Sequence, residues 1–167
     1  GTVDHLQNVR DLAEAIAVEL GYSQADAQEL GLAAALHDIG KVAVAESVLN
    51  SAGALDGEQW RIMQTHTVRG AEFLSKHTSF FVASIVARHH HERWDGTGYP
   101  DGLKGDAIPE AAAIVTVADS FDAMTTDRPY RAARSLDDAI EEIIAGRGTQ
   151  FSPRVVDALL RLHGRGE

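Results

Sequence analysis

The segment GLAAALHDIGK, residues 31–41, decides the fold class of this chain. Alanine and leucine favour the α-helix, and small side chains allow neighbouring helices to pack closely. Ser23 is a typical N-cap residue, so we predict a helix that begins after it and ends near Gly40. His37 and Asp38 directly follow an apolar run in this helix, which places two chemically active side chains at the edge of the core.

The same helical periodicity continues on both sides of this segment. No strand-like alternation longer than a few residues, no internal repeat and no low-complexity segment occurs in the sequence. Capping signals precede the later apolar runs, at Asp56 with Gln59, Pro109, Ser135, and Ser152 with Pro153. The sequence therefore predicts one all-α domain over residues 1–167. It is a compact bundle of about seven helices, near residues 3–20, 24–40, 57–76, 79–91, 110–125, 136 onward and 153–163.

The helical pattern breaks between Trp94 and Pro109. This stretch is rich in glycine and holds two prolines, so we predict a long irregular loop there. Loops of this length in compact domains are usually functional or disordered. Because this loop follows the pair His90-His91 closely, it is a candidate part of a functional site.

The composition limits the classes of partner and cofactor. A net charge of −10 argues against a broad basic surface for long nucleic acids, although metal ions and local cations still allow a small phosphate ligand. The absence of cysteine excludes disulfides, thiolate catalysis and Cys-ligated zinc, and it suits a cytoplasmic protein. No apolar run reaches the roughly 20 residues that span a membrane, so we expect no membrane contact. Because Gly1 stands in place of an initiator methionine, we interpret the chain as a fragment of a longer regulatory protein.

Eight histidines are the unusual feature of the composition, and several fall on apolar helical faces. His5 shares a face with Val9 and Ile16, and His66 is flanked by apolar residues along its helix. A lone buried histidine is more often a hydrogen-bonded core residue than a metal ligand. Apolar runs also lead into His37-Asp38, His90-His91 and Asp119. So many buried imidazoles and carboxylates are best satisfied together by metal ions.

Adjacent His37 and Asp38 favour two metal ions over one. Neighbouring side chains on a helix diverge by about 100°, so one ion would not easily bind both. A carboxylate that bridges two ions fits better, and two ions about 3.5–4 Å apart are the usual arrangement for phosphate-ester hydrolysis. Nitrogen and oxygen ligands suit iron, manganese, zinc or nickel. Iron or manganese is the pair we favour, with zinc and nickel as alternatives.

Four motifs resemble those of the HD-GYP family of the HD superfamily, which are bacterial phosphodiesterases of cyclic di-GMP. The motifs are HDIGK at 37–41, HHERWDGTGYP at 90–100, VAD at 117–119 and DRPYR at 127–131. The similarity extends from His5 to about Leu160, nearly the whole chain. The resemblance implies the helical HD-superfamily fold, with residues 98–100 as the GYP loop.

The resemblance also implies a set of metal ligands. Asp38 would bridge two ions, one held by three histidines and the other by His37 and Asp119, while His5 would complete a site or serve a third ion. Some relatives with three metals carry a glutamate where this chain has Gly1, so two ions are favoured over three. The ligand set implied in this way is His5, His37, Asp38, His66, His90, His91 and Asp119.

Further residues acquire catalytic and substrate-binding roles through the resemblance. Asp38 and Lys41 would be catalytic, with Lys41 also holding a phosphate oxygen or a bridging hydroxide. Arginine binds phosphate through its planar fork of donors, and the glycines and Tyr99 would shape the substrate groove. A rigid turn that supports the metal site is an equally weighted interpretation of this loop. The substrate-binding set is Lys41, Asp95, Gly98, Tyr99, Pro100, Arg128 and Arg131.

The chain departs from the family pattern at four positions outside the ligand set. Ala45, Ser51, Ala113 and Ser152 stand where proline, lysine, arginine and aspartate are usual. Loss of the lysine and the arginine would weaken substrate binding or support of the site. The remaining histidines receive no role as ligands: His77, His89 and His163.

We therefore expect a metal-dependent phosphodiesterase that cleaves cyclic di-GMP to pGpG, with a second cut to GMP left open, by attack of a metal-bridging hydroxide. Two alternatives remain: a catalytically weak or inactive module that binds cyclic di-GMP or a GGDEF domain, and an HD-type phosphohydrolase of another nucleotide. The seven ligands argue against the first alternative, and the GYP loop with the arginine pair argues against the second. Docking of GGDEF domains to the loop and a homodimer are left open as partners.

Overall fold

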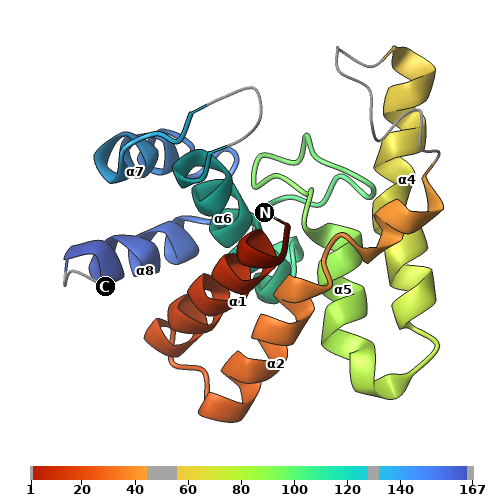
Figure 1. Ribbon diagram of the computed structural model, residues 1–167, viewed down its shortest axis with the longest axis horizontal. Helices are drawn as coiled ribbons and strands as arrows, with labels where there is room; N and C mark the ends of the chain where they lie inside the picture. The colour runs from red at the N-terminus through yellow and green to blue at the C-terminus, as the bar shows by residue number, and fades with distance from the viewer. Residues whose placement is uncertain (1, 45–55, 128–131, 165–167) are drawn as a thin grey trace.

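Seven α-helices form the described part of the chain, which confirms the predicted all-α fold. The computed structural model describes residues 2–44, 56–127 and 132–164, and these contain no strand (Figure 1). Three short 3-10 segments lie at Ile39–Ala43 (η1), Thr78–Phe80 (η2) and Gly105–Ala107 (η3). The α-helices are α1 (Thr2–Glu19), α2 (Gln24–Ala35), α4 (Gly57–Leu74), α5 (Phe81–His89), α6 (Glu110–Thr125), α7 (Leu136–Ala145) and α8 (Pro153–Gly164).

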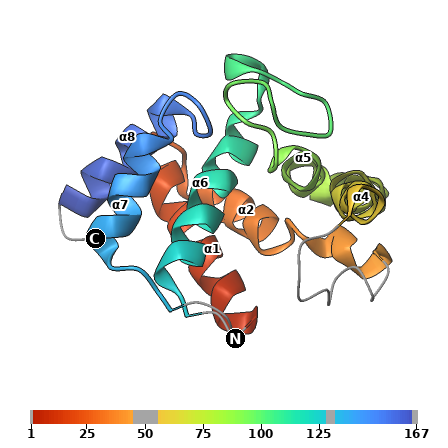
Figure 2. The ribbon, with the colours of Figure 1, turned by 90° about the horizontal axis from the view of Figure 1, so that it is seen from above.

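Helix α6 is the centre of the bundle because it is apolar on nearly every side. It contacts α1, α5, α7 and α8, and in both ribbon views α7 and α8 lie to one side of it and α4 and α5 to the other (Figures 1 and 2). Its residues Ile114, Val115, Val117 and Ala118 are fully buried. A helix that is hydrophobic all round is stable only inside the core. Asp119 directly follows this buried run, so it lies half-buried at the edge of the core.

The predicted N-terminal caps are confirmed at three helices. Ser23 accepts a hydrogen bond from the Asp26 amide over 3.1 Å, and Ser135 accepts one from the amide three residues on, also over 3.1 Å. Asp56 and Gln59 form a reciprocal capping box at the start of α4. Each cap satisfies an amide that the helix itself leaves free and contributes about 1 kcal/mol. Cap signals are local, so the sequence locates these starts well.

The end of α2 corrects the prediction that this helix reaches Gly40. The α-helix ends at Ala35, and the chain passes through Asp38 at φ −104° and ψ 16° into η1. The segment after the helix packs closely on α4: a Cβ on Gly40 would lie 1.8 Å from the carbonyl oxygen of His66. The premise that His37 and Asp38 diverge on one helix was therefore wrong.

Replacing Gly40 by alanine is expected to destabilise the fold by about 3 kcal/mol or more, because the new methyl group would overlap backbone atoms rather than a mobile side chain. Urea unfolding measures the effect. Gly57→Ala is the matched control, since a Cβ there would meet nothing within 4 Å. Equal unfolding midpoints for both variants and the wild type would contradict the close packing of η1 on α4.

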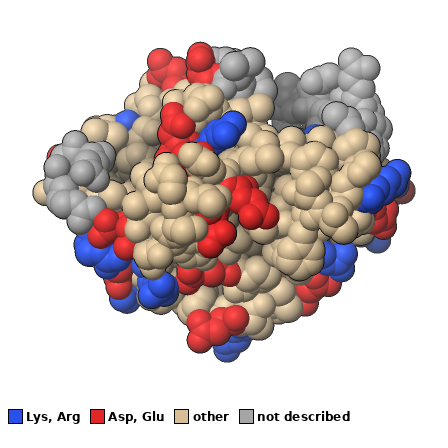
Figure 3. Space-filling view, turned by 90° about the horizontal axis from the view of Figure 1, so that it is seen from below, with Lys and Arg blue, Asp and Glu red and all other residues tan. Residues whose placement is uncertain are grey.

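The described helices include none that is both long enough and apolar enough to cross a membrane. On the face drawn in Figure 3, acidic and basic side chains are interspersed, and the described residues form no continuous basic surface there. This distribution agrees with the net charge of −10. The expectation that long nucleic acids are not ligands stays a prediction.

Candidate metal centre

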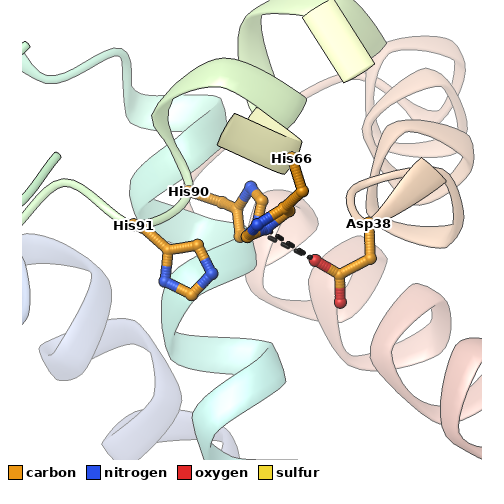
Figure 4. A group of neighbouring side chains, drawn as sticks. All are labelled: Asp38, His66, His90 and His91. Atoms are coloured by element: carbon orange, nitrogen blue, oxygen red, sulfur yellow. Dashed lines mark hydrogen bonds and ion pairs between the residues drawn. The ribbon is translucent and has the colours of Figure 1, made fainter. Parts of the chain in front are cut away.

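Four side chains from three parts of the fold converge on one point beside α6. Asp38 lies between α2 and η1, His66 lies on α4, and His90 and His91 directly follow α5 (Figure 4). Asp38 Oδ1 is 3.2 Å from Nε2 of His66 and 3.2 Å from Nε2 of His90. One ligand atom from each of the four lies within 4.8 Å of the others, a spacing that can hold a metal ion. We call these residues the Asp38 group.

A second group of ligand atoms lies next to the first. His5 of α1, His37 and Asp119 of α6 also place their ligand atoms within 4.8 Å of one another. Asp119 Oδ1 is 3.0 Å from His5 Nε2 and 3.5 Å from His37 Nε2. We call these residues the Asp119 group. The two groups together contain all seven residues that the sequence analysis proposed as ligands.

Asp38 links the two groups. Its Oδ2 atom lies 3.1 Å from His37 Nε2 of the Asp119 group, while its Oδ1 atom faces His66 and His90. Because the chain leaves the helix after Ala35, the side chains of His37 and Asp38 converge instead of diverging. One carboxylate with an oxygen toward each set of imidazoles suits a bridge between two cations.

Backbone carbonyl groups fix the orientation of three of the imidazole rings. Nδ1 of His37 lies 2.5 Å from the carbonyl oxygen of Ala34, and Nδ1 of His66 lies 2.7 Å from that of Met63. His90 Nδ1 is 3.0 Å from a carbonyl of α5 in the same manner. Carbonyl oxygens only accept, so each Nδ1 donates its proton, and Nε2 is the nitrogen left to face the centre. Metal-binding histidines are held in this way.

Unsatisfied polar atoms at the centre test whether these residues fit a metal. Among the described residues, the buried atoms His37 Nε2 and Asp38 Oδ1 have no hydrogen-bond partner. A buried acceptor without a partner is costly, and a group of them in one place is better satisfied by cations. Nitrogen and oxygen donors without sulfur fit divalent transition metals. The residues present therefore fit the metal ions that the sequence predicted.

The protonation states at the centre follow from burial and from close pairs. Burial alone would lower the pKa of His37, but the facing carboxylates of Asp119 and Asp38 outweigh it and raise the pKa to about 10. Burial, with His90 and His66 nearby, lowers the pKa of His91 to about 3. Close imidazoles outweigh burial at both aspartates and hold their pKa values well below the usual range. The aspartates are thus ionised, and a metal ion would take the place of the proton on His37.

The comparisons with known proteins agree with this geometry. The family model described as HD domain matches residues 2–155. This chain belongs to the HD domain family. The HD domain is 45% identical to the cyclic di-GMP phosphodiesterase response regulator RpfG of Xanthomonas campestris pv. campestris, over 96% of this chain and 43% of the relative. It is 40% identical to the 3'3'-cGAMP-specific phosphodiesterase 2 of Vibrio cholerae, over 93% of this chain and 30% of that relative.

The solved structures support the fold. The HD domain matches the HDG"Y"P protein Bd1817 from Bdellovibrio bacteriovorus with a TM-score of 0.76 at 21% identity, over 98% of this chain and 53% of that one. At this identity the likeness shows the shared helical architecture alone. The chain spans less than half the length of the two curated relatives named above, so the activities of those longer proteins do not transfer to it directly.

Asp122 of the HD domain is a buried carboxylate that the sequence analysis missed. It accepts a short hydrogen bond from Nδ1 of His5 and a second bond of 3.3 Å from the hydroxyl of Thr126. Asp122 bonds Nδ1 of His5, while Nε2 of the same ring faces Asp119. Asp122 therefore orients Nε2 of His5 toward the Asp119 group. The available signal was the spacing, because Asp122 lies one helical turn after Asp119 on α6.

Asp122→Ala is expected to weaken metal binding about 10- to 100-fold, the effect typical of removing the carboxylate behind a histidine ligand. Competition against a coloured chelator measures the affinity. Asp122→Asn should lose less, because an amide oxygen can still accept from His5. Asp11→Ala is the control, since that exposed carboxylate on α1 bonds only Gln7 in the described structure. Wild-type affinity in Asp122→Ala would refute the orienting role.

Lys41 and Tyr99 lie beside the Asp38 group, as the sequence analysis expected. Lys41 Nζ is 3.2 Å from Asp38 Oδ2, and its side chain remains 44% exposed. Tyr99 stacks on His91 with ring centres 4.9 Å apart and planes 13° from parallel. Burial and the charge of Asp38 raise the pKa of Tyr99 to about 12, so its hydroxyl stays protonated. Both residues can reach a ligand held at the centre.

Backbone contacts bring the GYP loop against the centre. A Cβ on Gly98 would lie 2.4 Å from the carbonyl oxygen of His91, so only glycine allows this approach. Pro100 is half-buried in the same turn. Asp95 accepts bonds from Thr97 and Arg93 within the loop, and its role in substrate binding stays a prediction. These contacts agree with the rigid-turn interpretation of the loop.

Glu92 anchors the far side of this loop. Its buried carboxylate accepts the amides of Asp101 over 3.1 Å and Leu103 over 3.0 Å. His89, which was left without a role, lies 3.2 Å from the same carboxylate, and Arg88 forms two bonds of 2.9 Å to Asp101. His89, Glu92 and Asp101 form a third cluster with ligand spacing. The glutamate oxygens are already occupied by loop amides, so we interpret this cluster as a brace.

Four residues of the sequence analysis lie outside the described residues. Two are the proposed phosphate-binding arginines, and two are departures from the family pattern: Arg128, Arg131, Ala45 and Ser51. The other two departures are described. Ala113 is 7% exposed within the core, and Ser152 is buried at the start of α8, where its hydroxyl lies 3.4 Å from the Val155 amide.

A cavity of about 420 Å³ opens beside the two groups of ligands. His90, His91 and Asp119 line it at the metal centre, and Tyr99 lines it at the GYP loop. Further walls come from α4 and from the turn between α7 and α8. A concave site with ionisable ligands at its base and aromatic rings on its wall is typical of a small-molecule site.

Proposed function

We propose that this HD domain is a metal-dependent phosphodiesterase that hydrolyses cyclic di-GMP. The observation that carries the proposal is the position of Asp38, with one oxygen toward each of two groups of metal ligands, beside a cavity that His90, His91 and Asp119 line. Two linked cation sites suit phosphate-ester hydrolysis. The relative at 45% identity that is named a cyclic di-GMP phosphodiesterase supports the substrate.

Two divalent ions, iron or manganese, are the cofactors that we propose. The Asp38 group would hold one ion and the Asp119 group the other, with Asp38 shared between them. When bound, such ions acidify water and stabilise negative charge on phosphate oxygens. Zinc and nickel suit the same donors, and a third ion would need ligands beyond these seven residues.

The chain's own residues would position the substrate. Lys41 presents an exposed ammonium group beside Asp38, where it can neutralise a phosphate oxygen. Tyr99 closes one side of the centre through its stack on His91 and can donate its hydroxyl proton. Arg128 and Arg131 stay predicted phosphate ligands. In the proposed reaction, water adds to one phosphorus of the ring as a P–O ester bond breaks, and the ring opens to linear pGpG.

A cyclic GMP-AMP dinucleotide is the second candidate substrate. The relative at 40% identity is named a 3'3'-cGAMP-specific phosphodiesterase, and the two substrates share the phosphodiester ring and differ in one purine. Docking of a GGDEF domain to the GYP loop, a second cut to GMP and a cytoplasmic location stay predictions. A receptor without activity is the rival function, since the altered positions Ala113 and Ser51 could weaken catalysis.

A substrate panel tests the proposal. The protein is loaded with Mn(II) or, without oxygen, with Fe(II), and is given cyclic di-GMP, 3'3'-cGAMP, cyclic di-AMP and linear pGpG. Release of pGpG from cyclic di-GMP at the highest kcat/KM supports the function. A preference for 3'3'-cGAMP would move the assignment to the second candidate. Metal uptake without hydrolysis of any of the four would overturn the proposal in favour of the receptor.

A further inference from the structure

Trp60 is an exposed aromatic residue in the wall of the cavity. Its side chain is 49% exposed, yet it lines the cavity together with Gln64, one turn further along α4. The other tryptophan, Trp94, packs against the hydrophobic core, and Trp60 does not belong to that core cluster. Burial in the core therefore does not account for a tryptophan at this position.

The rings of three residues form a continuous surface from the metal centre to the rim of the cavity. His91, a member of the Asp38 group, stacks on Tyr99. Trp60 meets Tyr99 edge to face, with ring centres 6.5 Å apart and an interplanar angle of 74°. Tyr99 thus lies between Trp60 and the proposed ligand His91 and contacts both rings.

The other described residues that line the outer cavity are polar, and few of them carry a free charge. Gln64, Gln150 and Ser120 line it with amides and a hydroxyl. Arg93 also lines the cavity and is paired with Asp95 through contacts of 3.2 and 3.3 Å. An aromatic wall beside uncharged donors and acceptors suits a flat heteroaromatic ring with a polar edge. It suits an acyl chain or a second phosphate poorly.

We propose that Trp60, with Gln64 beside it, forms a subsite that stacks one purine base of a cyclic dinucleotide. The proposal rests on the proposed function, because it takes the phosphate of that nucleotide to lie at the metal centre. In a nucleotide, one sugar separates the base from its phosphate. In the cavity, Tyr99 similarly separates Trp60 from the ligand His91, so a base can lie at Trp60 while its phosphate lies at the metal centre. Every base has a π-face, so stacking on tryptophan gives affinity for either purine.

The test compares three variants by steady-state kinetics with cyclic di-GMP on the metal-loaded protein. Trp60→Ala is expected to lower kcat/KM about 5- to 100-fold, the range that corresponds to the loss of one base–aromatic stack, with the larger part of the loss in KM. Trp60→Phe keeps a ring and should recover most of it. Phe73→Ala is the control, since Phe73 is a 58% exposed ring on the same helix and does not line the cavity.

The outcomes separate the subsite from the proposed function. If the wild type hydrolyses cyclic di-GMP and Trp60→Ala has the KM of the control, the subsite is wrong and the function stands. If the wild type hydrolyses no cyclic dinucleotide, cyclic di-GMP is titrated into the same proteins by calorimetry. A Kd that rises only in Trp60→Ala then supports the subsite without the function. Equal Kd values, or no binding, overturn both.

Discussion

Replacing Asp38 by alanine is expected to lower kcat for cyclic di-GMP by about 10⁴-fold or more, the largest effect of any single substitution in this chain. Asp38 is the residue that faces both groups of ligands, so its loss affects both proposed ions at once. Asp38→Asn should be nearly as inactive, because a neutral amide is a poor bridge between two cations. Hydrolysis is measured on protein saturated with Mn(II).

The loss in Asp38→Ala must be separated from a loss of folding. Removing the Asp38 carboxylate leaves His66 and His90 without the oxygen that faces them, but the apolar core around α6 is untouched. Far-ultraviolet circular dichroism should therefore show helix content close to that of the wild type. Turnover within about tenfold of the wild type in a folded Asp38→Ala protein would contradict the linking role of this residue.

The second large effect is expected from Asp119→Ala, which should remove one metal ion of two and lower kcat about 10³-fold. Asp119 belongs to the group with His5 and His37, and Asp38 keeps its partners in the other group. Metal per chain, measured after gel filtration, should fall from about two to about one. Asp11→Ala, an exposed carboxylate on α1, is the control and should keep both ions.

A substitution in the other group of ligands provides the complementary test. His91→Ala removes a ligand of the Asp38 group only, so it should also leave about one ion per chain. The double variant of Asp119 and His91 should then bind none. If Asp119→Ala alone released both ions, or kept both, the division of the seven ligands into two groups would be refuted.

Local signals in the sequence determine much of this fold. The capping residues Ser23, Asp56 and Ser135 act on amides within three residues of themselves, so their effect is visible in the sequence alone. The segment after α2 is different, because Gly40 there packs closely against the backbone of α4. That contact joins residues far apart in the chain, so no local sequence pattern predicts it.

The candidate site shows the same division. Apolar runs that lead into histidine and aspartate predicted the residues that now lie together, among them His66, His91 and Asp119. Asp122 on α6 and Glu92 after α5 received no role because an acidic residue is usually solvated, and burial distinguishes them only in the folded structure. The place of Trp60 beside Tyr99 likewise depends on how α4 meets the loop.

Counting bound metal against turnover on one sample tests the central claim most directly. The protein is stripped of metal with a chelator, titrated anaerobically with Fe(II) or Mn(II), and assayed with cyclic di-GMP at each step. The account predicts that hydrolysis rises to its maximum at about two ions per chain, with little turnover below one. Full activity in the stripped protein or at one ion per chain, or no activity at two, would contradict a binuclear centre linked by Asp38.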